Sequence, residues 1–392
     1  MKILYICSAD LSGQLGSLGS VRHIMEVSEN LHDLGNCVRL IVPGYARYTH
    51  ITPLRLTYVP LIKVRFLRTL VYELLAPLFV MAYLFFWRPD IVYWRQAYLT
   101  FFPVLLGRLL GKRIITEVNG LTLDEVKSEP LSKARTRLIL AIERFNYRFS
   151  SHLICVAPQI RTRILEYYRL SPDKVSVILN GVNSDRMPVI DTREAKKKIG
   201  IDPDEKVVGF VGHFFPWDGI EYLIEAALDI IKEINNIRFL IVGHGLWGEH
   251  LPKLVEEKGL SEYFLFTGKV DWERLYLYVN AFDVATAPYS KAINFQSGRS
   301  SLKILEYFAC KKPVVASQTE VIPEVVDLDR KGFGVTVPPE RPKELAKAIL
   351  GLLRDKRLRE QLGTGSREYV VKDRSWKRVA QEIQVIMTAL ID

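Results

Sequence analysis

The sequence contains little cysteine: Cys7, Cys37, Cys155 and Cys310 are the only four among 392 residues. They lie far apart, each in or beside an apolar segment, and no two form a Cys-x-x-Cys pair. This spacing excludes a disulfide framework and a zinc site built on cysteine pairs. We expect four reduced thiols in the core of a cytoplasmic protein.

Several catalytic signatures are also missing. The chain has no Gly-x-x-x-x-Gly-Lys-Ser/Thr phosphate loop, no His-Glu-x-x-His motif and no Gly-x-Ser-x-Gly motif. The N-terminus lacks the pattern of a secretory signal, since the apolar run after Lys2 is short and predicts a first strand. Asp327 and Asp329 are interpreted as a polar turn before Gly332, not as a metal-binding Asp-x-Asp, so we expect no metal requirement.

The net excess of positive charge lies in the N-terminal half of the chain. Residues 1–190 hold 24 Lys and Arg against 14 Asp and Glu, whereas residues 191–392 hold 30 of each. The N-terminal half should therefore meet an anionic partner: a membrane surface, a polyanion or a phosphorylated acceptor. Nucleic acid is not expected, because the sequence has no nucleic-acid-binding motif and no row of basic residues with interleaved aromatics.

One long apolar stretch, residues 69–87, approaches the length that spans a bilayer. Glu73 and Pro77 interrupt it, and a basic segment precedes it. The favoured interpretation is a core helix of an N-terminal domain. A helix at a membrane interface is the second, and a transmembrane span is the third, because α/β patterning continues on both sides.

Strand and helix patterns alternate along the chain, which predicts two doubly wound α/β domains with parallel sheets. The length suits two domains. We place the first at residues 1–183 and the second at 184–375, with residues 184–203 as a polar linker. A final helix, residues 376–392, is expected to pack back on the first domain.

The most informative segment is residues 289–317. A polar loop with Gly298 follows an apolar strand, and an amphipathic helix is expected from about Ser301 to Cys310. Helical spacing places Lys303 and Glu306 on one face, together with Arg299 before the helix.

This arrangement suits a nucleoside diphosphate. A helix N-terminus with nearby cations binds phosphate, and a carboxylate one turn later can accept hydrogen bonds from ribose hydroxyls. The alternative is a solvated helix face with a Lys–Glu pair contributing about 0.2–0.5 kcal/mol. The segment's place after a strand favours a ligand site, because open α/β sheets bind ligands at strand ends.

The segment SLKILEYFACKKPVVAS, residues 301–317, resembles the nucleotide-sugar motif of GT-B glycosyltransferases of family 4, also called group 1. The segments Glu-Val-Asn-Gly (117–120), Asn-Gly-Val-Asn (180–183) and Gly-His-Gly (243–245) occur in the family's order. The resemblance implies a GT-B fold, two Rossmann-like domains facing across a cleft. It also implies a retaining, metal-independent transferase that uses a nucleotide-diphosphate sugar, with a UDP-sugar favoured and GDP-mannose as the alternative. The acceptor would be a glycan or a lipid-linked sugar in cell-envelope polysaccharide or glycoconjugate synthesis.

The resemblance also assigns candidate residues. Donor binding is expected from Gly212, His213, Gly243, Gly268, Gly298, Arg299, Ser301, Leu302, Lys303 and Glu306. The catalytic candidates are Arg95, Glu117, Asn119 and Lys303. The acceptor candidates, in or just after a glycine loop that is expected to end at Ser20, are Gly16, Gly19, Ser20 and His23.

Two departures from the family pattern affect the donor site. The family often has two glutamates eight positions apart, whereas this chain has Gly298 and Glu306. An Arg and a Lys that neutralise the diphosphate in many members are replaced by His213 and Asp218. Either Lys303 and a neighbouring arginine supply the cations, or the site is impaired. Two rivals therefore remain: a GT-B nucleotide-sugar epimerase, and a catalytically degenerate relative that acts as a partner protein.

Overall fold

A computed structural model describes residues 1–11, 18–62, 67–97, 99–121, 132–292 and 298–392. The chain forms two compact units. The first comprises Met1–Asn180, Trp376–Asp392 and the short segment with Gly298 and Arg299. The second comprises Gly181–Phe295 and Ser300–Ser375. The two doubly wound α/β domains expected from the sequence are confirmed.

The first unit is built on a seven-stranded parallel sheet with the order β3-β2-β1-β4-β5-β6-β7. The central strands are apolar and buried on both faces, as parallel strands covered by helices require. The strands are β1 (Lys2–Ile6), β2 (Cys37–Pro43), β3 (Arg55–Val59), β4 (Ile91–Arg95), β5 (Arg113–Val118), β6 (His152–Cys155) and β7 (Val175–Val177).

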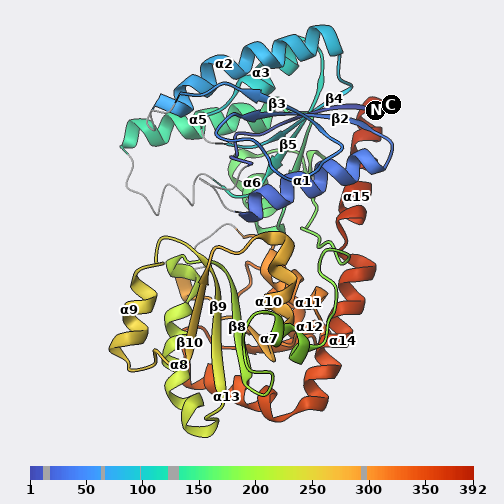
Figure 1. Cartoon of the computed structure of the whole chain (residues 1–392). Helices are drawn as coiled ribbons and strands as arrows, with labels where there is room; N and C mark the ends of the chain where they lie inside the picture. The colour runs from blue at the N-terminus through green and yellow to red at the C-terminus, as the bar shows by residue number, and fades with distance from the viewer. Residues whose placement is uncertain (12–17, 63–66, 98, 122–131, 293–297) are drawn as a thin grey trace. The chain divides into compact units, whose positions relative to one another are not determined.

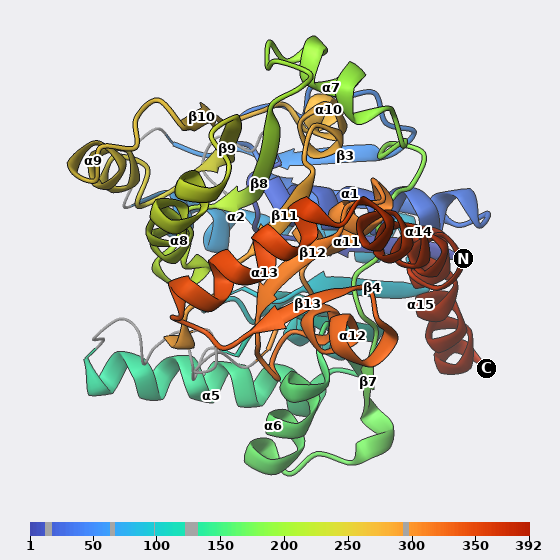
Figure 2. The ribbon, with the colours of Figure 1, turned by 90° about the horizontal axis from the view of Figure 1, so that it is seen from below.

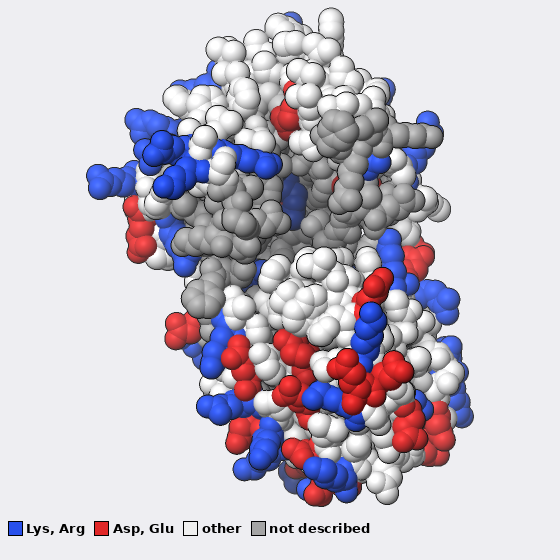
Figure 3. All heavy atoms as spheres, turned by 90° about the vertical axis from the view of Figure 1, so that its left-hand side faces the viewer, with Lys and Arg blue, Asp and Glu red and all other residues white. Residues whose placement is uncertain are grey.

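Right-handed crossovers place the helices of the first unit on both faces of its sheet. The unit contains α1 (Leu18–Asp33), α2 (Arg68–Ala82), which a π-helical turn η2 (Tyr83–Trp87) extends, α3 (Phe102–Leu109), α5 (Lys133–Phe149), α6 (Pro158–Tyr168) and α15 (Trp376–Ile391). Helices α2, α3 and α5 pack side by side on one face, and α1 and α15 pack together on the other (Figure 1). On the side shown in Figure 3, Lys and Arg gather on the first unit beside uncharged surface.

The second unit has a six-stranded parallel sheet with the order β10-β9-β8-β11-β12-β13. The strands are β8 (Lys206–His213), β9 (Ile237–His244), β10 (Phe264–Gly268), β11 (Val284–Ala287), β12 (Val314–Ser317) and β13 (Gly334–Val337). The chain leaves β8 toward β9 on one side and returns to β11 on the other. The topological switch point, where open α/β sheets bind ligands, is therefore between β8 and β11.

Helices cover both faces of the second sheet (Figure 2). They are α7 (Thr192–Lys198), α8 (Ile220–Glu233), α9 (His250–Glu257), α10 (Leu275–Asn280), α11 (Leu302–Ala309), α12 (Pro323–Lys331), α13 (Pro342–Arg354) and α14 (Lys356–Asp373). Helices α8 and α13 pack in one apolar cluster, and α10 and α11 pack in the other.

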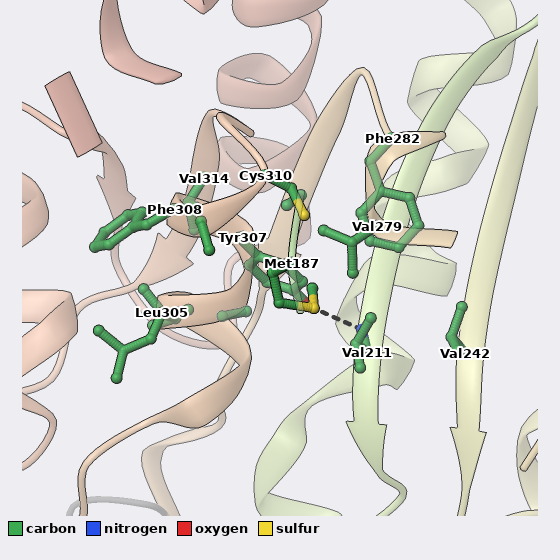
Figure 4. Packing of buried hydrophobic residues seen from close by; sticks show 14 of the residues in the cluster. Met187, Val211, Val242, Val279, Phe282, Leu305, Tyr307, Phe308, Cys310 and Val314 are labelled. Carbon is green, nitrogen blue, oxygen red and sulfur yellow. Dashed lines mark hydrogen bonds between the residues drawn. The ribbon is translucent and has the colours of Figure 1, made fainter. Parts of the chain in front are cut away.

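Tyr307 anchors α11 to β8 and β11 by hydrogen bonds. Its hydroxyl accepts a hydrogen bond from the Val211 amide of β8 at 2.7 Å and donates to the Thr286 carbonyl of β11 at 3.3 Å. The ring is fully buried among apolar residues that include Phe282 and Phe308 (Figure 4). The N-terminus of α11 is thereby held close to the carboxyl ends of both strands.

Several local expectations are wrong. Helix α7 lies inside the expected linker, where Lys196 is buried and pairs with Asp283 at 2.7 Å. Asp327 and Asp329 belong to α12 instead of a turn, because Pro323 starts a helix that continues to Lys331.

The cysteines are mostly where the sequence places them. Cys7, Cys155 and Cys310 are buried, and burial raises the pKa of each thiol to about 12. Cys37 is exposed at the start of β2, so the expectation of a fourth core thiol is wrong.

Residues 69–87 were expected to form a core helix, but only one stripe of this helix is buried in the core. Of the residues in α2, only Tyr72, Ala76 and Val80 are buried, and Leu84 continues their stripe into η2. The remainder of this apolar helix is partly or fully exposed.

Candidate functional site

A backbone hydrogen bond connects the loop after β8 to the loop after β11 at the switch point. The Ser290 amide donates to the Trp217 carbonyl at 3.1 Å. Gly219 has a φ of +66°, and a Cβ at this position would lie 2.0 Å from the Pro288 carbonyl oxygen. Glycine is therefore required here, both for the backbone conformation and for the close approach of the two loops.

Lys303 and Asp218 form an ion pair at this point. The Lys303 Nζ atom lies 2.5 Å from Asp218 Oδ1, and the two side chains are only 13% and 7% exposed. The ammonium group also lies 4.2 Å from the ring centre of Phe210. A solvated Lys–Glu helix face is thereby excluded, and a buried cation at the strand ends takes its place.

Glycines near the ends of β8 and β9 allow close packing beside Lys303. A Cβ at Gly212 would lie 2.8 Å from Lys303 Nζ, and one at Gly243, which has a φ of +134°, would lie 1.9 Å from the Gly212 carbonyl oxygen. Gly268 ends β10 with a φ of +66°, and a Cβ at this position would meet nothing within 4 Å. The backbones of β8 and β9 thus approach each other without side chains above Lys303.

Two histidines end the neighbouring strands β8 and β9. The rings of His213 and His244 are 4.9 Å apart. Burial lowers the pKa of both, helped by His244 and Lys303 at His213 and by Lys269 at His244. Both are therefore neutral near pH 7 and can exchange hydrogen bonds without adding charge.

The N-terminus of α11 is partly occupied by the protein itself. The helix begins at Leu302, one residue later than expected, with Ser301 as its cap. The Ser301 amide donates to Glu324 Oε2 at 2.8 Å, and Arg374 donates to Glu324 Oε1 at 2.5 Å. Sequence reasoning missed Glu324 and Arg374, because a pair 50 positions apart leaves no local signal.

The remaining donor candidates are divided between the units. Glu306 is buried in α11, one turn after Leu302, with 4% of its surface exposed. Gly298 and Arg299 group with the first unit, where a Cβ on Gly298 would lie 3.1 Å from Gln159 Cβ. The structure therefore does not bring Gly298 and Arg299 together with Lys303 in one unit.

The catalytic candidates of the first unit converge on Glu117 at the end of β5. Its Oε2 accepts from the Tyr93 hydroxyl at 2.6 Å, and its Oε1 accepts from Arg95 at 2.6 Å and from Asn119 at 2.7 Å. The His23 Nε2 atom lies 2.9 Å from the same Oε1. Burial alone would raise the pKa of Glu117, but His23 and Arg95 hold it well below the ordinary range.

His23 links this carboxylate to other parts of the first unit. Its Nδ1 atom lies 2.8 Å from Asn180 Oδ1, and its ring meets that of Trp376 edge-on at 5.2 Å. Gly19 and Ser20 lie in the first turn of α1, not in a loop, because the helix starts at Leu18. The candidate Gly16 lies outside the described residues.

A metal site does not emerge from the described part of the chain. Within it, no group of three or more His, Cys, Asp or Glu residues is arranged to hold a metal ion.

Two family models match consecutive parts of the chain. Residues 18–186 match Glycosyltransferase Family 4, and residues 191–369 match Glycosyl transferases group 1. The boundary between the two matches lies close to the boundary between the structural units.

Relatives and solved structures agree with these matches. The chain is 26% identical over 312 residues to an uncharacterized glycosyltransferase of Methanocaldococcus jannaschii, covering 77% of this chain and 76% of that one. Sucrose-phosphate synthase from Thermosynechococcus elongatus shares the fold with a TM-score of 0.79 at 20% identity, over 99% and 98% of the two chains. HepE of Anabaena, solved in complex with UDP-glucose, has a TM-score of 0.74 at 17% identity, over 99% and 100%.

The GT-B expectation of two Rossmann-like domains is therefore confirmed at the level of fold. Because the two family matches together span most of the sequence and the fold agrees, the chain belongs to the group 1, family 4 glycosyltransferases.

Proposed function

We propose that this glycosyltransferase is a retaining enzyme that moves a sugar from a nucleotide-diphosphate sugar, with a UDP-sugar favoured, to a glycan or lipid-linked acceptor in the cytoplasm. One observation carries the proposal: the buried Lys303 ammonium lies under the glycine-lined ends of β8 and β9, at the switch point of the second sheet. HepE, which shares the fold, was solved with UDP-glucose.

Lys303 and Glu306 would divide the recognition of the donor. The Lys303 ammonium would bind the diphosphate and stabilise the charge that develops as the leaving group departs. Glu306, one turn deeper in α11, would accept hydrogen bonds from the ribose hydroxyls. The neutral His213 would donate or accept one further hydrogen bond.

The diphosphate would have to compete with Asp218 for Lys303. An anion that approaches the ammonium meets a carboxylate already 2.5 Å away. Movement of Asp218 on donor binding would free the cation, and Lys303 could then replace a metal ion as the countercharge. We therefore expect transfer to be insensitive to chelators.

In the first unit, Glu117 would position other groups. Its side chain is 1% exposed and both oxygens already have partners, so direct proton transfer to a substrate is disfavoured. This burial revises the expectation that Glu117 itself is catalytic. Arg95, Asn119 and His23, which surround it, would contact the acceptor, together with Gly19 and Ser20 at the start of α1.

Retention would follow from attack on the same face of the sugar from which the diphosphate leaves. Asp218, the carboxylate beside Lys303, is paired with the ammonium and only 7% exposed, so the proposal gives it no role as a nucleophile. A covalent sugar–enzyme intermediate is therefore not needed for the proposal.

The Lys303–Asp218 pair also motivates a second candidate, a catalytically degenerate relative. If the pair never opens, the second unit cannot hold a diphosphate, and the chain would act as a partner protein. An epimerase is distinguished more simply, because it would form product from a nucleotide sugar with no acceptor present.

The test is transfer by the full-length chain and by Glu306→Gln, with Glu344→Gln on the exposed face of α13 as a matched control. We expect Glu306→Gln to lose transfer by at least about 100-fold, in the range seen when a polar contact to substrate is removed. Its melting temperature should stay near that of the wild type, and Glu344→Gln should keep full activity. Undiminished transfer by Glu306→Gln would refute the proposed site.

A further inference from the structure

Helix α2 and the turn η2 carry an apolar stripe that no described residue covers. Leu70, Leu74 and Leu78 are 54%, 64% and 56% exposed, and Phe85 and Phe86 are 56% and 90% exposed. Leu70, Leu74 and Leu78 follow one another at intervals of four residues and Phe85 comes seven residues later, so these residues lie on one face of the helix. The other apolar stripe, Tyr72, Ala76, Val80 and Leu84, is buried against the first sheet.

The C-terminal end of this stripe combines aromatic rings with basic side chains. The Arg39 guanidinium lies 4.6 Å from the ring centre of Trp87, and Lys2 Nζ donates to the Trp87 carbonyl at 3.3 Å. Arg88 follows directly and is exposed. Amphipathic rings beside long cationic side chains are typical of the boundary between lipid tails and headgroups.

Helix α5, in the same layer as α2 and α3, adds a row of cations. Its exposed basic residues are Lys133, Arg135, Arg137, Arg144 and Arg148. Among the described acidic residues of this layer, Glu143 is buried and accepts from Tyr147 and Tyr168, and Glu73 of α2 accepts from Thr100. Asp90 accepts from the Lys2 amide at 2.7 Å. The described part of this layer is therefore apolar along α2 and positive along α5.

We propose that the outer face of α2 and η2, together with α5, docks this chain on the surface of an anionic lipid bilayer. The apolar stripe would enter the boundary between headgroups and tails, and the α5 cations would contact lipid phosphates. By length and composition Arg68–Trp87 could cross a membrane, but its buried stripe is part of the core of the first unit. The helix therefore lies along the bilayer.

The positive charge of α5 favours an anionic bilayer over a second copy of the chain as the partner of this surface. A second copy of the chain would carry the same positive charge along α5 and would offer no countercharge for it. An anionic bilayer complements both features of the layer at once. The surface belongs wholly to the first unit, so the proposal is independent of the sugar donor.

The experiment is co-sedimentation of the full chain with vesicles of phosphatidylcholine alone or with phosphatidylglycerol added. We expect binding to the anionic vesicles that weakens with rising salt, because exposed charges are screened over about 8 Å at physiological ionic strength. Leu74→Glu combined with Leu78→Glu should weaken binding at least about tenfold, since it places charge in the apolar boundary. Arg135→Ser combined with Arg137→Ser should also weaken binding and flatten its salt dependence.

Matched controls separate the surface from general effects. Val385→Glu introduces a charge at an exposed apolar position of α15, on the opposite face of the first sheet, and should bind as the wild type does. Lys343→Ser with Lys347→Ser removes two exposed charges from α13 of the second unit and should also have no effect. Calorimetric titration with UDP should give the same affinity in the α2 double variant as in the wild type.

Three results would overturn the proposal. One is failure of the wild type to bind phosphatidylglycerol vesicles at low salt. Another is wild-type binding by the Leu74→Glu, Leu78→Glu variant. The third is a lipid-free dimer, seen by sedimentation velocity, that this variant dissociates, because the stripe would then bind a second copy of the chain.

Discussion

Replacement of Lys303 by methionine tests the ion pair at the switch point. The substitution leaves Asp218 with 7% of its side chain exposed and without the ammonium that lies 2.5 Å away in the wild type. Removal of one partner from a buried ion pair typically costs about 3–5 kcal/mol, because the remaining charge is desolvated and unpaired. We expect a loss of this size in the free energy of unfolding, measured by urea denaturation at pH 7.

The double variant Lys303→Met, Asp218→Asn separates stability from function. Removal of both charges should restore most of the stability, since an uncharged pair carries no buried unpaired ion. Donor binding should not recover. Loss of a charged hydrogen-bond donor costs about 1.5–3 kcal/mol, which corresponds to UDP binding that is about 10- to 150-fold weaker.

For Asp218→Asn alone we expect the affinity for UDP to change in the opposite direction. The substitution frees Lys303 from a competing carboxylate, so UDP should bind about tenfold more tightly, a gain of about 1.4 kcal/mol. Calorimetric titration of the three variants against the wild type is the assay. If the stable double variant binds UDP with wild-type affinity, Lys303 does not contact the diphosphate, and the reasoning is refuted.

Three further predictions concern stability. Glu117→Gln should lower the free energy of unfolding by about 3–5 kcal/mol at pH 7. Because folding lowers the pKa of Glu117, the stability that this carboxylate contributes is present above about pH 4.3 and is lost as the pH falls. The wild type should therefore lose more stability than the variant between pH 5 and 3. Glu221→Gln should remove a fall in stability between about pH 4.3 and 7, because burial raises the pKa of Glu221 to about 7 and the folded state keeps a proton that the unfolded state releases. Gly243→Ala should prevent stable folding, because the added Cβ would lie 1.9 Å from a carbonyl oxygen. Gly351→Ala is the control: its Cβ would have no atom within 4 Å, so this variant should be neutral or more stable by about 0.5–1 kcal/mol. Thermal melting measures both.

Local periodicity predicted much of the donor site but not its pairing. Helical spacing places Lys303 and Glu306 on α11, and glycines mark the ends of β8 and β9. Asp218 is 85 positions from Lys303, in a loop whose position depends on the join between Gly219 and Pro288. The sequence showed that the negative charge of Asp218 is unfavourable for binding a phosphate. Only the fold shows that this carboxylate is paired with Lys303.

The first unit shows the same limit. Glu117 was predicted as a catalytic candidate, but its buried position depends on His23 of α1 and Arg95 of β4, which meet it from separate elements. Helix α2 was misinterpreted because nearly all of its residues are apolar. Because Glu73 accepts from Thr100 and does not mark the outer side, hydropathy could not distinguish Leu74, which is exposed, from Ala76, which is buried.

The most direct test of the central claim is thermal protection of the chain by a panel of UDP-, GDP-, ADP- and dTDP-sugars, with and without EDTA. The account predicts that one of these donors, a UDP-sugar, raises the melting temperature by several degrees at concentrations well above its Kd, equally with and without EDTA. If none of the donors shifts the melting temperature, the second unit does not bind a nucleotide sugar, and the proposed transferase activity is contradicted.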